Sequence, residues 1–173
     1  MITIRIGAAL ALGLLAASGA AAEPVKSLCQ VELKEAPEAP ARRAETVAFM
    51  KRVEGQVRVL RPKASGGFDE MKAEIGMELR ASDAVATGGN GAFDAIFTDN
   101  STLTGVADTC VEISTYLYDA AAKTGEFRMR LGRGVVSVAA GEVAKSAPGR
   151  MSVMIRDDAN LAVTGTRIVI RAN

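Results

Sequence analysis

Along most of the chain, apolar and polar residues alternate with a period of two, the pattern of a β-strand with one buried face. The segment GAFDAIFT (91–98) places Phe93, Ala95 and Phe97 on one face, and EFRMRL (126–131) alternates apolar residues with arginines. The same alternation recurs in TVAFMKRVEGQVRVLRP (46–62), TCVEIST (109–115), RMSVMIR (150–156) and TRIVIRAN (166–173). We therefore expect a series of short strands after residue 45.

Turn-forming residues separate these segments about every ten residues, as is typical of all-β domains. They are Pro62, Gly66-Gly67, Gly76, Gly88-Gly89, Asn90-Gly91, Asp99-Asn100, Gly105, Gly125, Gly141 and Pro148-Gly149. The best candidate for a helix is AETVAFMKRV (44–53), but its Thr and Val residues favour a strand. The pattern predicts one all-β domain over residues 46–173, with short strands in a solenoid-like, roll-like or sandwich arrangement.

The first 22 residues have the composition of a cleaved signal peptide, which we expect to be helical. Arg5 is followed by an apolar and small-residue run at 6–17, and Ala20–Ala22 precede Glu23. The run is shorter than the ~20 apolar residues of a membrane-spanning helix. We expect export to the periplasm, with secretion or the cell surface as alternatives, and no transmembrane span after cleavage.

Residues 23–45 are predicted to be a Pro/Ala-rich linker, because they hold three prolines that disfavour a regular helix. Within it, CQVEL (29–33) alternates like a short strand. The chain has two cysteines, Cys29 and Cys110, and an even pair in an exported protein indicates a disulfide. A structural bond is favoured over a redox-active pair, because the two cysteines lack C-x-x-C spacing.

The composition excludes several kinds of chemistry. Among 173 residues there is no His, which removes His-based acid–base catalysis, Ser-His and Cys-His nucleophiles, and most zinc or iron sites. Apolar residues make up 49% of the chain but aromatic residues only 4%, so aliphatic side chains must form most of the core. We expect no cofactor and no bound metal.

The net charge of the chain gives no evidence for a polyanionic partner. The chain has 21 Lys and Arg against 20 Asp and Glu, and loss of Arg5 with the signal peptide would leave 20 of each sign. A neutral chain lacks the long-range field that draws proteins onto nucleic acid. We therefore expect no nucleic-acid partner.

The order of motifs from about Val47 to Ile170 resembles the FecR domain family. The segments on which this resemblance rests are VEGQVRVLRP, GMELRASDAVATGGNGAFDAIFTDNSTLT, DTCVEISTYLYD, GEFRMRLGRGVVSVAAG and MSVMIRDDANLAVTGTRIVI. Ser82 departs from the family pattern, which usually has Gly at this place. The positions that match the family's turn and structural motifs are Asp83, Thr87, Gly88, Asn90, Gly91, Asp99, Asn100, Ser101, Gly165 and Thr166.

The resemblance implies an all-β extracytoplasmic domain. In iron-uptake signalling, FecR-like proteins are membrane-spanning anti-sigma regulators with this domain in the periplasm, whereas stand-alone members are generally regarded as binding or scaffold modules. This sequence resembles the exported domain alone. The implied partner is an envelope protein or polymer.

The segment TGGNGAFD (87–94) has two interpretations. It matches the first five places of the calcium-binding β-roll repeat, but Phe93 stands where the Asp ligand is needed and Asp94 comes one residue late. A one-residue shift in a strand sends the side chain to the opposite face. We therefore predict a tight hairpin turn at Asn90-Gly91 rather than a calcium site.

Two other motifs are also interpreted as structural. TDNST (98–102) begins like an EF-hand loop but lacks the later ligands, so a hairpin turn is expected. VTGT (163–166) resembles the aspartic-protease triplet but has Val163 in place of the catalytic Asp. Gly165 is instead predicted to lie close to a neighbouring backbone.

Charged residues in two places could form a surface site. Arg128, Arg130 and Arg133 form a basic row that could meet an anionic polymer, although a solvated outer face is favoured. Asp157-Asp158 is the densest carboxylate pair, but adjacent strand residues point apart, so a solvated turn is expected there.

Three hypotheses on function follow. The favoured one is an exported, non-catalytic FecR-like β-module that binds or scaffolds a protein or envelope polymer in the periplasm. The first alternative is an accessory regulator in extracytoplasmic, iron-uptake-type signalling. The second is a metal-independent envelope hydrolase that uses Asp and Glu alone. We do not expect an enzyme.

Overall fold

The computed structural model describes Cys29 and residues 45–146, 149–156 and 158–173. The predicted signal peptide (1–22) and nearly all of the predicted linker (23–45), including the strand expected after Cys29, lie outside the described residues. Within the described part, no helix has the length and apolar character needed to cross a membrane.

The described chain forms short strands and one five-residue helix. These are β1 (Thr46–Glu54), β2 (Val57–Pro62), β3 (Phe68–Lys72), β4 (Glu78–Arg80), β5 (Ala84–Thr87), β6 (Ala92–Phe97), β7 (Thr102–Gly105), β8 (Cys110–Asp119), β9 (Thr124–Ala139), α2 (Glu142–Ser146), β10 (Met151–Ile155), β11 (Ala159–Ala162) and β12 (Arg167–Ala172). The all-β prediction is confirmed, and the segment 44–53 contains β1 rather than a helix.

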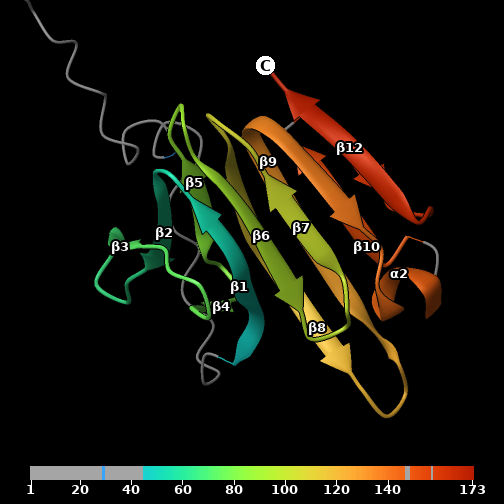
Figure 1. Cartoon of the computed structure of the whole chain (residues 1–173). Helices are drawn as coiled ribbons and strands as arrows, with labels where there is room; N and C mark the ends of the chain where they lie inside the picture. The colour runs from blue at the N-terminus through green and yellow to red at the C-terminus, as the bar shows by residue number, and fades with distance from the viewer. Residues whose placement is uncertain (1–28, 30–44, 147–148, 157) are drawn as a thin grey trace, which may run out of the picture.

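The strands form one curled sheet, shaped like half a barrel (Figure 1). Their order is β3-β2-β5-β8-β9-β7-β6-β1-β4, and β10, β11 and β12 join through β9. All described pairings are antiparallel except that of β10 with β9. In Figure 1, β12 and α2 lie on the side of the molecule opposite β3.

β9 belongs to both halves of the sheet. Its first part pairs with β8 and β10, and its last part pairs with β7 and β12. Between the two parts lies Gly134, with a φ of 91°, in the left-handed region that favours glycine. A Cβ at Gly134 would lie 2.5 Å from the Cα of Thr109. β9 therefore needs a residue without a side chain at Gly134, where it bends from one half of the sheet to the other.

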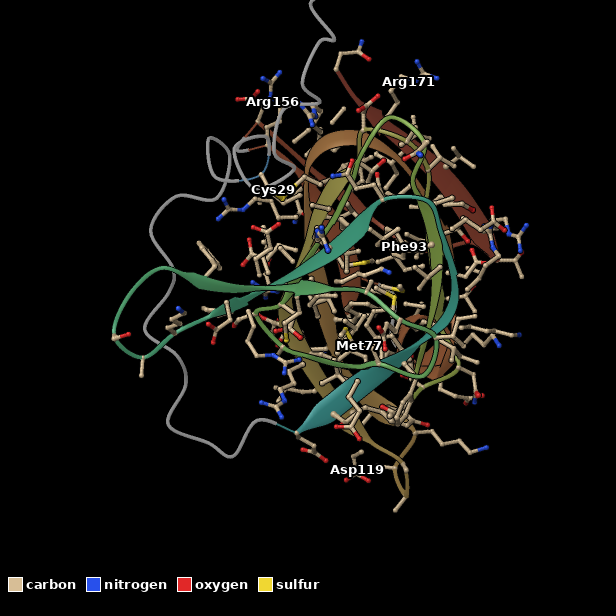
Figure 2. All side chains as sticks on the ribbon, turned by 60° about the vertical axis from the view of Figure 1, so that its left-hand side comes forward. Cys29, Met77, Phe93, Asp119, Arg156 and Arg171 are labelled. Carbon is tan, nitrogen blue, oxygen red and sulfur yellow. A yellow bond between two sulfur atoms is a disulfide. The ribbon has the colours of Figure 1, made fainter. Side chains whose placement is uncertain are left out.

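The core follows the alternation seen in the sequence. Phe93, Ala95 and Phe97 on β6 are all at most 2% exposed. On β9, Phe127 packs against Phe97 with ring centroids 4.4 Å apart, and Tyr116 lies 5.0 Å from Phe127. Figure 2 shows the labelled Phe93 among the side chains that the curled sheet encloses. Phe97, Tyr116 and Phe127 thus gather in the core, and aliphatic residues fill most of the rest.

We expect Gly134→Ala to destabilise the fold by about 2 kcal/mol or more, because it adds a steric clash to an unfavourable backbone conformation. Gly66→Ala is the matched control: its φ of 86° is similar, but no atom lies within 4 Å of the added Cβ. Urea unfolding of both variants measures the difference. Equal losses for the two variants would contradict the role of the β9 bend.

Candidate functional site

The TGGN segment forms a turn that does not close a hairpin. The Gly91 N–H donates to the Gly88 carbonyl at 2.9 Å, but the flanking strands do not pair with each other. β5 pairs with β2 and β8, and β6 pairs with β1 and β7. The predicted hairpin is therefore wrong: the turn carries the chain from one half of the sheet to the other. The residues of this turn are compatible both with a hairpin and with a connection between the two halves of the sheet.

The glycines of this turn allow close packing against a second turn. A Cβ at Gly91 would lie 2.2 Å from the Gln56 carbonyl oxygen, and a Cβ at Gly55 would lie 2.0 Å from the Asn90 carbonyl oxygen. The Asn90 side-chain oxygen accepts from the Gln56 N–H at 3.2 Å. Contact between two backbones explains the glycine content of both turns.

Asp94, the misplaced calcium-ligand candidate, is held by other partners. Its carboxylate accepts from Arg52 Nε at 2.7 Å and from the Thr104 hydroxyl at 2.7 Å. The hydrogen bond from Arg52 is the main cause that lowers the pKa of Asp94. Among the described residues, no group of three or more carboxylate, thiol or imidazole side chains is placed to hold a metal ion.

Thr87 and Thr109 tie the β5 end to the bend of β9. The Thr87 hydroxyl accepts from the Thr109 N–H at 2.9 Å and donates to the Val106 carbonyl at 2.5 Å. The Thr109 hydroxyl accepts from the Val135 N–H at 3.0 Å, next to Gly134. Thr87, predicted as a motif residue, therefore supports the same bend.

Asp83 makes a buried ion pair and is fully enclosed. Its two carboxylate oxygens accept from Arg61 Nε at 2.9 Å and Nη2 at 2.7 Å, and it also accepts from the Arg80 backbone N–H. Arg61 Nη2 reaches the Glu78 carbonyl as well, at 3.1 Å. One guanidinium therefore connects β2, the second strand of the order, with β4, the last.

Ser82 has a φ of 72°, in the left-handed region where glycine is preferred. It is buried, and its N–H donates to the Ile113 carbonyl at 2.7 Å. Glycine would adopt this backbone conformation without the steric cost that Ser82 bears.

Asp99, Asn100 and Ser101 close the β6–β7 hairpin, as the TDNST segment predicted. Asn100 takes a φ of 64°, and the Ser101 N–H donates to the Asp99 carboxylate at 3.0 Å. The same carboxylate accepts from the Tyr116 hydroxyl at 3.2 Å and from the Val143 N–H at 3.2 Å. Asp99 therefore also anchors the first turn of α2.

Gly165 and Thr166 lie in the bend between β11 and β12. No atom lies within 4 Å of a Cβ placed on Gly165, so the predicted close approach to a neighbouring backbone is wrong. The Thr166 carbonyl accepts from the Ala140 N–H at 3.0 Å, which positions the start of β12. Asp158 lies in a turn, as expected, while Asp157 is outside the described residues.

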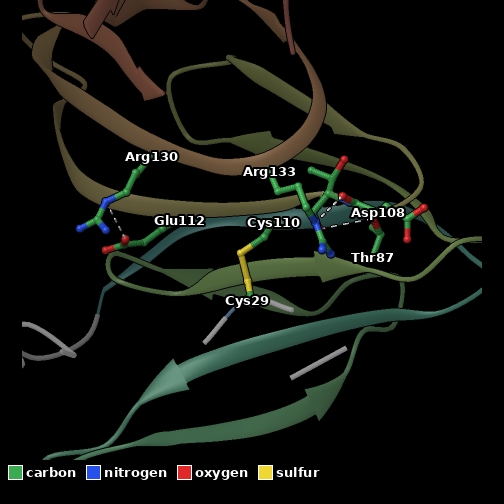
Figure 3. The surroundings of a disulfide bond; sticks show 8 residues. Cys29, Thr87, Asp108, Cys110, Glu112, Arg130 and Arg133 are labelled. Atoms are coloured by element: carbon green, nitrogen blue, oxygen red, sulfur yellow. Dashed lines mark hydrogen bonds and ion pairs between the residues drawn. A yellow bond between two sulfur atoms is a disulfide. The ribbon is translucent and has the colours of Figure 1, made fainter. Parts of the chain in front are cut away.

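The predicted Cys29–Cys110 disulfide is present, with Cα atoms 5.7 Å apart, and it joins Cys29 to the start of β8 (Figure 3). The ring that it closes is long, since the two cysteines are 81 positions apart. On the chain-entropy model, such a bond stabilises by about 4 kcal/mol. The bond fastens one residue of the predicted linker to the sheet.

The three arginines of the basic row each have a partner. Arg128 pairs with Glu126 at 2.5 Å. Figure 3 shows the other two: Arg130 lies 3.7 Å from Glu112, and Arg133 Nε donates to the Asp108 carbonyl at 3.2 Å. Burial raises the pKa of Glu112, and the charge of Arg130 opposes that shift. The carboxylates of Glu126 and Glu112 reduce the positive charge that this row could offer to an anionic ligand. This favours the interpretation of the row as a solvated outer face.

A groove of about 910 Å³ opens at one end of the molecule, a feature that the sequence did not predict. Figure 2 shows Asp119, one of its lining residues, at the end opposite Arg156 and Arg171. The lining comes from β1, β2, β4, β8 and the start of β9 and from neighbouring loops: Glu45, Thr46, Val47, Arg61, Pro62, Arg80, Ala81, Ser82, Thr98, Ser114, Thr115, Tyr116, Leu117, Tyr118, Asp119, Ala120, Thr124 and Gly125.

The groove combines hydroxyl groups, tyrosine rings and two guanidinium groups. Arg61 is occupied by Asp83, whereas Arg80 is partly buried and its Nε, covered by protein atoms, has no hydrogen-bond partner among the described residues. The rim carries carboxylates at Glu45 and Asp119, and Asp119 accepts from two backbone N–H groups of the following turn. Such a concave surface with a few convergent polar groups is typical of a ligand site.

Comparisons with protein-family models, with curated proteins and with solved structures found no match to this chain. The resemblance to the FecR domain family therefore stays a prediction based on the order of its motifs.

We expect Ser82→Gly to stabilise the protein by about 1 kcal/mol, because glycine adopts the left-handed region without the steric cost that Ser82 bears. Ser114→Gly, on β8, is the control, and it should destabilise by about 0.5–1 kcal/mol as glycine does in a strand. Thermal unfolding monitored by circular dichroism would compare the two. A loss of stability in Ser82→Gly would contradict the prediction.

We expect Asp83→Asn to cost about 3 kcal/mol, because it leaves the Arg61 guanidinium without its buried counter-ion. Asp94→Asn, in the more exposed pair with Arg52, should cost about 1 kcal/mol at neutral pH. The Asp94 contribution is present above the usual Asp pKa and fades as the pH falls through the lowered folded value. Denaturant titrations at neutral and acidic pH test both variants, and equal costs at neutral pH would contradict the assignment.

Proposed function

We propose that this protein is an exported, non-catalytic FecR-like β-module that binds a protein or polymer of the cell envelope. The observation that carries the proposal is the groove of about 910 Å³, a volume within the range of about 300–1,000 Å³ found for ligand sites. Side chains from separate strands line this groove together. The apolar run at the N-terminus supports export.

The buried carboxylates support a non-catalytic role. Asp83 is neutralised by Arg61, and Asp99 accepts hydrogen bonds from Ser101, Tyr116 and Val143. A general acid or base needs a carboxyl group that reaches the substrate. Neither Asp83 nor Asp99 lines the groove, so both carboxylates are better explained as structural groups.

The test is capture of envelope material by the immobilised protein. Leu117 lines the groove and is 56% exposed, so Leu117→Glu should change the groove surface without disturbing the core. Val169→Glu is the matched control, because Val169 is 70% exposed on β12 and lies outside the groove lining. We expect Leu117→Glu to lose several-fold of the captured protein or polymer, and Val169→Glu to retain it.

Mass spectrometry and sugar analysis of the captured fraction identify what binds, and circular dichroism shows that both variants are folded. Equal capture by Leu117→Glu and by the unmodified protein would exclude the groove as the binding surface. Capture no greater than that of a blank support would reject the proposed function itself.

A further inference from the structure

β12 is an edge strand: along the described chain it pairs with β9 and with no other strand. Its six residues keep one continuous register, from Arg167 opposite Ala139 to Ala172 opposite Gly134, without a bulge. In Figure 1, β12 lies at the margin of the molecule, and no described strand lies beyond it. The second edge of β12 is therefore open to pairing with another strand.

The ladder with β9 determines which backbone groups this open edge presents. The Ala140 N–H donates to the Thr166 carbonyl at 3.0 Å, so these two residues form a hydrogen-bonded pair just before the first residue of β12. In an antiparallel ladder, hydrogen-bonded and non-hydrogen-bonded pairs alternate. Ile168 and Ile170 therefore direct their N–H and C=O groups to β9, and the residues between and beside them direct theirs to the open edge. The outward-directed residues are Arg167, Val169 and Arg171.

The side chains of the same three residues lie on the outer face of the sheet. Arg167 and Arg171 are exposed and Val169 is 70% exposed, whereas Ile170 is buried. Figure 2 shows the labelled Arg171 at the outer surface of the molecule. Within the part of the chain that the structure describes, neither arginine has a hydrogen-bond or ion-pair partner. The open edge thus carries two unpaired positive charges with an apolar side chain between them.

The other edge strands of the described sheet are shorter, and the longest of them has paired charges. β4 has three residues and β11 has four. β3 has five, and its carboxylates are paired: Asp69 lies 2.9 Å from Lys63, and Glu70 lies 3.5 Å from Arg58. β12 is therefore the edge that has both the length and the unpaired charge to select a partner.

Charged side chains on an edge strand also serve to prevent pairing. An edge with that role alone would be polar throughout, whereas Val169 is a β-branched residue of the kind that packs well against a neighbouring strand. The arginines do oppose one occupant, a second copy of this chain. Pairing of two β12 strands over their full length places Arg167 of each copy opposite Arg171 of the other, and like charges directly opposite each other are destabilising.

We propose that the open edge of β12 accepts an extended strand from a partner protein that carries acidic side chains opposite Arg167 and Arg171 and an apolar side chain opposite Val169. Main-chain hydrogen bonds to the three outward-directed residues supply affinity, and two cross-strand ion pairs select an acidic partner. No residue of β12 lines the groove, so this inference goes beyond the proposed function and does not depend on what the groove binds.

The test measures binding of two short capped peptides to the full chain by fluorescence anisotropy. Both peptides are rich in threonine and have a central valine. The acidic peptide has a glutamate two residues before and two residues after this valine, and the control peptide has lysines at the same places. We expect the acidic peptide to bind about tenfold more tightly, because it makes two favourable cross-strand charge pairs where the control peptide makes two unfavourable ones.

Two sets of variants separate the charge from the backbone. The double variant Arg167→Gln, Arg171→Gln should bind both peptides equally, and Arg128→Gln, which removes an exposed arginine of β9, should keep the preference. Val169→Pro removes an N–H that faces the open edge and keeps the ladder with β9, so it should weaken binding by about tenfold. Val169→Thr keeps both the N–H and the branched shape, and it should retain binding.

Amide hydrogen exchange followed by nuclear magnetic resonance needs no variant, so it decides the question even if Val169→Pro does not fold. In the free protein, the N–H groups of Ile168 and Ile170 should be protected by β9, and those of Val169 and Arg171 should exchange rapidly. A saturating concentration of the acidic peptide should slow exchange at Val169 and Arg171 by about tenfold or more.

Equal affinity for the two peptides, or an unchanged preference in the double variant, would overturn the inference. No saturable binding of the acidic peptide, or no added protection at Val169 and Arg171, would also overturn it. A dimer in analytical ultracentrifugation that Val169→Pro converts to a monomer would overturn it in favour of a second copy of this chain.

The capture experiment distinguishes failure at this edge from failure of the proposed function. Val169→Glu should keep the groove ligand and lose the acidic peptide, because the new carboxylate repels the glutamates of the peptide. Leu117→Glu should lose the groove ligand and keep the acidic peptide, since Leu117 lies on β8 and outside β12.

Discussion

β9 is the strand that both halves of the sheet share, so its bend at Gly134 fixes how the halves meet. The Thr109 hydroxyl holds the bend by accepting a hydrogen bond from the Val135 N–H, and the Thr87 hydroxyl accepts one from the Thr109 N–H. Curling brings the inner faces of distant strands together, which lets Phe97 and Phe127 pack in one core. A chain with few aromatic residues can therefore still enclose a continuous apolar interior.

A polar contact joins two strands that lie far apart in the strand order. Arg61 on β2 binds Asp83 and the Glu78 carbonyl of β4. Asp83 also accepts from the Arg80 backbone N–H, so one carboxylate serves residues of both strands.

The alternation of side chains was enough to predict the buried face of strands such as β6, because a strand's period of two is a local property, but not of β5, which is buried throughout, or of β11, which is exposed throughout. It predicted the inward residues of β6 and β9, and the hairpin at Asp99–Ser101. It could not predict strand partners. The Gly88–Gly91 turn has the chemistry of a hairpin, yet it links strands from different halves, because the packing of Gly91 against Gln56 decides its path.

The groove was beyond prediction for a related reason: Thr46, Arg80 and Tyr118 are far apart in sequence and meet only when the sheet curls. The buried residues that carry the FecR resemblance, such as Asp83, Thr87 and Asp99, form turns and internal contacts. A motif made of such residues describes a scaffold, and a scaffold does not determine what is bound on it. The chemistry that selects a ligand must then come from side chains that the motif leaves unspecified, such as the exposed Leu117 of the groove.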